Sequence, residues 1–289
     1  MKTFLKPVSL LALSSLILAC SLFTGFTPTI PEETSLPTPV IPSPTESPVP
    51  TSVQSGTVIS FNNVSFTIPS GLASGASSEA VPAVTDQSGA PWEIAPAHIK
   101  FVLSGYALQD KFHQPQIYVI PAQGYISSNP GASESIDRLN AILRTVVPAT
   151  PDNLPFIPFF NAGQIFAAQI ETLQFHGGSG VRFLTEYAQY FASVNNVDLF
   201  YHFQGLMDDS EYYIVAILPV TAPMLADNED PNAVVPPDGV PFPGYDDPNA
   251  DYAAYYDAIA QKLNATAAAG FTPPLDALDA LIQSITVNP

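Results

Sequence analysis

Residues 199–220 read LFYHFQGLMDDSEYYIVAILPV, and this stretch decides the fold. Two runs within it, 199–205 and 212–220, are rich in β-branched and aromatic residues, which favour strands. Between them, Asp208-Asp209-Ser210 supplies residue types that favour turns. Because so short a connection joins antiparallel strands and not parallel ones, the stretch predicts two neighbouring strands of an antiparallel sheet.

The sheet is expected to extend into the residues before this stretch. Runs 165–175 and 181–191 are also strand-like, and Gly177-Gly178-Ser179-Gly180 lies between them. Glycines at this position are typical of a tight turn between strands. With the two strands above, these runs predict a four-stranded antiparallel meander.

Shorter strands are predicted nearer the N-terminus. The alternating residues of 57–68 are interrupted by Asn62-Asn63, which tolerates positive φ and predicts a tight hairpin. Runs 99–103 and 116–120 are typical of strands. Segment 69–89 is small, polar and rich in glycine and serine, so we expect a loop there.

Segment 133–143 predicts a helix. Its apolar residues recur at helical spacing, and Ser133 stands where an N-cap is expected. The stripe consists of Ile136, Leu139, Ile142 and Leu143.

Two more helices are predicted near the C-terminus. One begins at Asp251, as N-cap, and carries tyrosines at helical spacing. The other covers 274–282, where Asp276 and Asp279 would favour the helix dipole. Strands grouped together, with helices to cover them, predict the α+β class: an antiparallel sheet with helices packed on it.

The charge balance limits the partners of the chain. It has 8 basic and 26 acidic residues, and two of the basic ones, Lys2 and Lys6, lie in the first six residues. Without those two the net charge is about −20, which repels nucleic-acid phosphates and offers no basic patch to anionic lipids. We therefore expect no nucleic-acid partner, and favour cationic or neutral ligands.

The first twenty residues resemble the signal peptide of bacterial lipoproteins. A short positive segment is followed by the apolar run 8–19, which is too short to span a bilayer. The run ends in Ile17-Leu18-Ala19-Cys20, and this cysteine is the only one in the sequence. The resemblance implies removal of residues 1–19 and acylation of Cys20, which would hold the protein outside the cytoplasm on a membrane.

Residues 20–54 are expected to form the lipid anchor and a stalk. From Thr27 to Thr51 the sequence is dominated by proline, threonine and serine, which cannot form a core and favour extended polyproline II. Residues 55–289 are then expected to form a single folded domain.

This domain resembles the PsbP-like α/β/α sandwich. The likeness rests on an opening hairpin that ends in Ile68-Pro69-Ser70-Gly71, on paired strands around Gly205 and Val220, and on a closing helix with the apolar tail 282–287. Loop 222–250 departs from that pattern. The resemblance implies a binding or accessory module without catalytic activity.

Loop 222–250, the Pro/Asp-rich loop, is long enough to predict a functional or disordered segment. Its end has oxygen-bearing residues at the spacing of a calcium loop, although glycine and glutamate are missing from the later positions. The candidate calcium ligands are Asp246, Asp247, Asn249 and Asp251. The alternative is a solvated acidic loop with Asp251 as the N-cap.

No recognisable catalytic motif is present. His176-Gly177-Gly178-Ser179-Gly180 is similar to an oxyanion loop, but the Gly-x-Ser-x-Gly elbow of such hydrolases is absent. The four histidines lack the close spacing of a zinc site. An enzyme would need carboxylates that converge on its substrate, for which Glu171 and Glu186 are the candidates. Separately, the tyrosines of the helix that begins after Asp251 could stack on a sugar ring.

We therefore expect a lipid-anchored extracytoplasmic binding or accessory module. It would present its sheet and the Pro/Asp-rich loop to an envelope protein or ligand. The alternatives are an extracytoplasmic enzyme with an unrecognised acid/base site, and a purely structural envelope protein.

Overall fold

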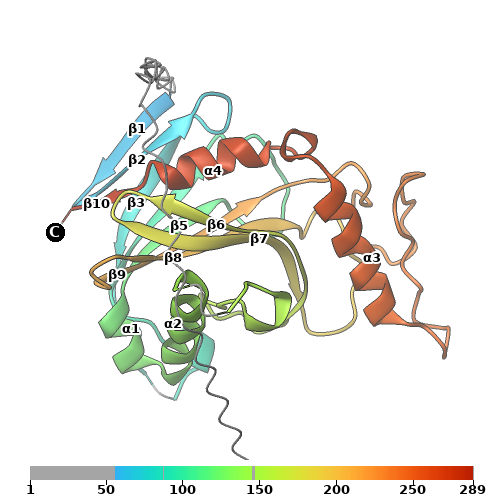
Figure 1. Ribbon diagram of the computed structural model, residues 1–289, viewed down its shortest axis with the longest axis horizontal. Helices are drawn as coiled ribbons and strands as arrows, with labels where there is room; N and C mark the ends of the chain where they lie inside the picture. Colours follow the sequence, from blue (N-terminus) through green and yellow to red (C-terminus); the bar gives the residue numbers. More distant parts are fainter. Residues whose placement is uncertain (1–55, 87, 145–146, 289) are drawn as a thin grey trace, which may run out of the picture. The chain divides into compact units, whose positions relative to one another are not determined.

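The computed structural model describes residues 56–86, 88–144 and 147–288, which belong to one compact unit. Most strands belong to one antiparallel sheet of seven (Figure 1). In spatial order these are β3 (Gly75–Val81), β4 (His98–Ser104), β5 (Gln116–Pro121), β9 (Tyr212–Pro219), β8 (Phe200–Met207), β7 (Gly178–Ala188) and β6 (Gly163–Phe175).

The predicted meander forms the last four positions of this order. Strands β6 and β7 pair through a turn in which Gly177 has φ 74°, and β8 pairs with β9 through a turn in which Ser210 has φ 62°. Positive φ suits glycine and is tolerated in tight turns. Pairing of β5 with β9, with Gln116 opposite Ile217, joins the N-terminal strands to the meander.

One face of the sheet is covered by α1 (Ala122–Ser128) and α2 (Pro130–Leu143), shown below the sheet in Figure 1. Leu139 of α2 is fully buried against residues such as Phe183 and Val215 of the sheet. Helix α2 thus buries the apolar stripe that its sequence predicted.

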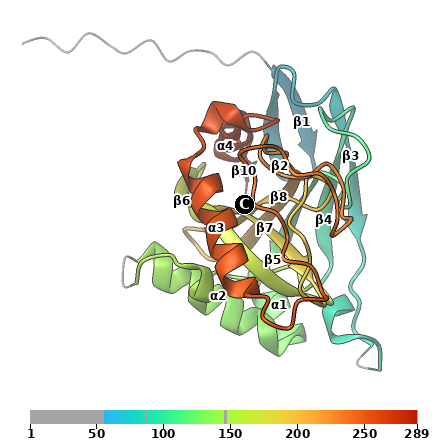
Figure 2. The same cartoon turned by 90° about the vertical axis from the view of Figure 1, so that its right-hand side faces the viewer.

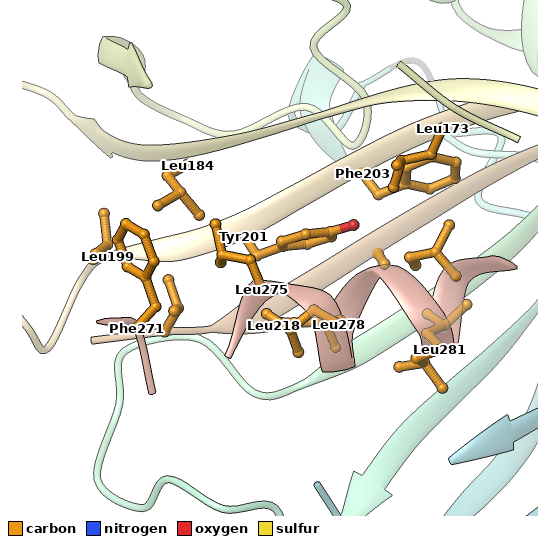
Figure 3. Packing of buried hydrophobic residues seen from close by; sticks show 14 of the residues in the cluster. Leu173, Leu184, Leu199, Tyr201, Phe203, Leu218, Phe271, Leu275, Leu278 and Leu281 are labelled. Atoms are coloured by element: carbon orange, nitrogen blue, oxygen red, sulfur yellow. The ribbon is translucent and has the colours of Figure 1, made fainter. Parts of the chain in front are cut away.

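The opposite face carries α3 (Tyr252–Ala265), α4 (Leu275–Gln283) and a small sheet of β1 (Gly56–Phe61), β2 (Val64–Pro69) and β10 (Thr286–Val287) (Figure 2). Leu275, Leu278 and Leu281 of α4 point toward Tyr201 and Leu218 of the sheet (Figure 3). Three single-turn 3₁₀ helices complete the fold, at Pro91–Glu93, Pro151–Asn153 and Ala268–Gly270.

Helices on both faces of an antiparallel sheet confirm the predicted α+β class. The hairpin at Asn62, where φ is 52°, is also confirmed. No helix in the described ranges has both the length and the hydropathy needed to cross a membrane.

Several predicted elements were wrong. The expected loop 69–89 contains β3, which pairs with β4 at the sheet edge. Helix α2 begins at Pro130, not near Ser133, because the side chain of Asn129 caps it by accepting from Gly131 N–H at 3.1 Å. Asp279 lies beyond the first turn of α4, and its side chain, only 14% exposed, faces Arg182 instead of the helix N-terminus.

The Pro/Asp-rich loop has no helix or strand, yet the fold holds its first half. Leu225 and Ala226 are buried, and Asn196 N–H donates to the carbonyl of Ala226 at 2.8 Å. Phe242 packs edge-on against Tyr255 of α3, with ring centroids 5.3 Å apart. The space enclosed beneath the loop is only about 10 Å³, so the loop's own side chains fill it.

Candidate functional site

The two carboxylates proposed for an enzyme lie at different places on the sheet. Glu171 on β6 is opposite Arg182 on β7 and forms a 2.6 Å ion pair with it. Glu186 is four residues further along β7, about 13 Å away at strand spacing. The structure therefore does not bring this pair into one cleft.

Arg182 is the centre of a buried polar network that holds α4 on the sheet. Its guanidinium lies 3.4 Å from Asp279 and also donates to the carbonyl of Gln169. Tyr201 donates its hydroxyl to Asp279 at 2.8 Å. Burial raises the pKa of Asp279, while Arg182 and the bond from Tyr201 oppose that rise. Since every group has a partner of the fold itself, we assign this network a structural role.

The histidines do not form a metal site. Within the described ranges, no group of three or more His, Cys, Asp or Glu residues is placed to hold a metal ion. His202 is fully buried beneath α2, and its Nε2 donates to the carbonyl of Ile157 at 3.0 Å. His176 is exposed beside the β6–β7 turn.

The candidate calcium ligands have local roles in this structure. Asp247 accepts from Asn249 N–H at 2.9 Å, which forms a turn, and Asp251 accepts from Ala254 N–H at 2.9 Å, which caps α3. The predicted N-cap at Asp251 is confirmed. Asp246 is exposed. Thermal melting with calcium tests whether these residues also bind the ion.

Two tyrosines of α3, Tyr255 and Tyr256, hold the segment that follows β7, and Tyr256 also lines the pocket described next. Tyr255 accepts from Val194 N–H at 2.9 Å, and Tyr256 donates to the carbonyl of Ala192 at 3.0 Å. Both side chains are buried. These contacts tie the segment that follows β7 to α3 and thereby position the site described next.

A groove with two adjoining compartments lies where β7 ends. Both compartments are lined by Ala188, Gln189 and Tyr190, and we call the whole the β7-end groove. The outer compartment, about 740 Å³, lies toward α3 and is mainly apolar. The inner compartment, about 560 Å³, lies on the other side of Tyr190. Both volumes are in the usual range of ligand pockets.

Exposed aromatic side chains line this groove. Phe112 is 72% exposed, Tyr190 68% and Phe191 57%, the largest values for aromatic residues in the described chain. Phe191 stacks on Tyr252 of α3 with ring centroids 4.4 Å apart. Large apolar side chains gathered at a concave surface mark an interaction site, because such exposure is otherwise unfavourable.

Aromatic rings also form the interior of the inner compartment. Phe160 packs against Tyr187 with ring centroids 4.4 Å apart, and His113 packs against Phe200 at 4.5 Å. Burial lowers the pKa of His113 to about 4, so this ring is neutral at pH 7. The hydroxyl of Tyr187 is buried and has no hydrogen-bond partner within the described residues.

Three carboxyl groups complete the inner compartment: Glu186, Asp198 and Glu229. Glu186 is 2% exposed and accepts from Asn195 N–H at 2.8 Å. Burial raises the pKa of Glu186 well above its ordinary value; the bond from Asn195 opposes that rise and the charge of Asp198 adds to it. Asp198 accepts from Asn195 Nδ2 at 2.8 Å.

The walls of the groove are held by hydrogen bonds between distant segments. Phe112 N–H donates to the carbonyl of Val197 at 3.1 Å, and Lys111 Nζ donates to the carbonyl of Asn196 at 2.8 Å. Asn196 Oδ1 in turn accepts from Ala222 N–H at 2.8 Å, at the start of the Pro/Asp-rich loop. The groove is thus preformed, and does not depend on a free loop.

The sequence does not predict this groove, because its residues come from segments that are distant along the chain. One signal was present: Tyr190-Phe191 at the end of a strand-like run, where turn residues are more usual.

Comparison with protein-family models, with curated proteins and with solved structures finds no match for the chain.

Proposed function

We propose that the protein is a lipid-anchored, extracytoplasmic binding module, and that the β7-end groove is its ligand site. The observation that carries this proposal is the pair of adjoining compartments bordered by exposed Phe112, Tyr190 and Phe191. A preformed concave surface of this size with a few polar groups is the usual form of a small-ligand site.

The anchor is part of the same proposal. Cys20 and the stalk at residues 20–54 lie outside the described residues, so the lipoprotein assignment rests on the sequence resemblance alone. Acylation of Cys20 would anchor the domain to a membrane, on the side that faces away from the cytoplasm. The stalk, extended at about 3.1 Å per residue, would raise the groove above the headgroups.

Two features favour a binding module over its alternatives. An enzyme needs catalytic groups that converge on one substrate atom, and Glu171 and Glu186 do not converge. A purely structural protein would gain nothing from an exposed aromatic groove, which costs solubility.

NMR titration of the full-length protein in maltoside micelles tests this proposal. Small neutral and cationic aromatic fragments would be added, and amide shifts followed. We expect shifts clustered at residues 112–113, 160–165 and 186–191, weakened at least about tenfold by Tyr190→Ala. Val58→Ala, which removes a 70% exposed side chain on β1, is the matched control. Shifts centred elsewhere, or unaffected by Tyr190→Ala, would refute the assignment.

A further inference from the structure

We infer that the inner compartment of the β7-end groove binds an alkylated ammonium group. This inference rests on the proposed function and names the ligand chemistry of that same site. It follows from the conjunction of aromatic rings and carboxyl groups in a single pocket.

The aromatic lining supplies the first part. Phe112, Phe160, Tyr187 and Tyr190 line the compartment, and their ring faces carry the negative end of the quadrupole. A cation within about 6 Å of such a face is attracted, most strongly where water is excluded. A bare metal ion would lose its hydration shell there, and no three His, Cys, Asp or Glu residues of the described chain are placed to hold one. An alkylated ammonium has an apolar surface that suits the rings.

The charge of the compartment points the same way. Its lining residues include Asp198 and Glu229, besides Glu186, whose pKa is raised by burial, and no lysine or arginine. Lys111, next to the compartment, directs its ammonium to the carbonyl of Asn196. His113 is neutral because burial lowers its pKa. The strongly acidic chain adds a field that attracts cations and repels anionic or phosphate ligands.

Carboxyl groups alone would not define a site. The aromatic rings that line the same compartment add an independent preference for an alkylated cation over a hydrated metal ion.

Choline and its neutral isostere 3,3-dimethylbutan-1-ol form a matched pair of probes, because they share shape and differ in charge. Amide shifts of the full-length protein in maltoside micelles would be followed for each. We expect choline to bind about tenfold more tightly, with shifts at residues 112–113, 160–162 and 186–190. Equal concentrations of sodium chloride should not reproduce the shifts.

Three variants locate the effect. Asp198→Asn keeps the acceptor for Asn195 and removes the charge, so it should weaken choline severalfold and leave the isostere unchanged. Tyr190→Leu removes an exposed ring that the fold does not need, with the same selective loss expected. Asp137→Asn, an exposed residue of α2 that lines neither compartment, is the control and should change neither probe.

The outcomes separate this inference from the proposed function. If both probes bind equally at the groove, the ammonium inference is wrong and the ligand groove stands. If neither probe nor any fragment shifts the groove amides, both are wrong. Choline shifts that survive Asp198→Asn and Tyr190→Leu, or that sodium chloride reproduces, would also overturn the inference.

Discussion

Acid should destabilise this fold through His202, and the size of the effect follows from its surroundings. The ring is fully buried, donates from Nε2 to Ile157, and has no partner for Nδ1 in the described part of the chain. Burial lowers the pKa of His202 from 6.5 to about 3; the bond to Ile157 opposes that shift and the charge of nearby His113 adds to it. The folded state therefore keeps this ring neutral at pH 5.

The sign and magnitude follow from proton linkage. The unfolded ring takes up a proton below pH 6.5 and the folded ring does not, so stability is present above pH 6.5 and is lost as pH falls toward 3. At pH 5 the loss is about 2 kcal/mol, from 1.5 pH units at about 1.36 kcal/mol each. For a domain of this size that is about 4–8 °C in Tm.

The variant that isolates this effect is His202→Gln, whose side-chain amide can still donate to Ile157 but does not titrate. Thermal unfolding of full-length protein in maltoside micelles would be followed between pH 8.5 and 5. We expect the wild type to lose about 4–8 °C more than the variant over this range. Between pH 7.5 and 8.5 the two should change equally. An equal fall of Tm below pH 6.5 in both proteins would refute the reasoning.

Four other perturbations have defined outcomes. Arg182→Met should lower the free energy of unfolding by about 3–5 kcal/mol, because it leaves the buried carboxyl of Asp279 without its cation. Glu171→Gln, at the exposed end of the network, should lower it by less than about 1 kcal/mol. Equal losses in the two variants would contradict this reasoning. Gly205→Ala, whose new Cβ would lie 2.7 Å from a ring carbon of Phe203, should cost about 1–3 kcal/mol of unfolding free energy. Gly163→Ala, whose new Cβ would lie at an ordinary 3.9 Å from the carbonyl oxygen of Ala188, should cost much less, and denaturant titration compares the two variants. Cys20→Ser should abolish incorporation of labelled fatty acid and release the protein from membranes; retained label would disprove lipidation there. Millimolar calcium should change Tm no more than sodium chloride of equal ionic strength does. A rise of several degrees with calcium alone would establish a metal site in the Pro/Asp-rich loop.

The central strands could be predicted from sequence because their signals are local and strong. Strands β8 and β9 are almost continuously apolar and are buried on both faces, and a turn triplet separates them. The edge strand β3 has no such signal: its sequence is GASSEAV, most of its residues are partly or fully exposed, and only β4 pairs with it. A polar edge strand of this kind resembles a loop in sequence.

Helix caps and the site were harder to predict for a different physical reason. Asn129 caps α2 seven residues before Ile136, where the apolar stripe begins, so the stripe alone misplaces the helix start. The β7-end groove joins Phe112, Phe160 and Glu186, which only the strand order brings together. The sequence marks Glu186 as a candidate carboxylate, but the burial of its side chain beside Asn195 depends on tertiary contacts.

Crystals of the protein soaked with a set of neutral and cationic fragments would test the central claim most directly, because electron density locates the bound molecule. We predict that fragments occupy the two compartments on either side of Tyr190, with ammonium-bearing fragments in the inner one beside Asp198. Density confined to other surfaces, such as the β1 edge or the Pro/Asp-rich loop, with the β7-end groove empty, would contradict the account.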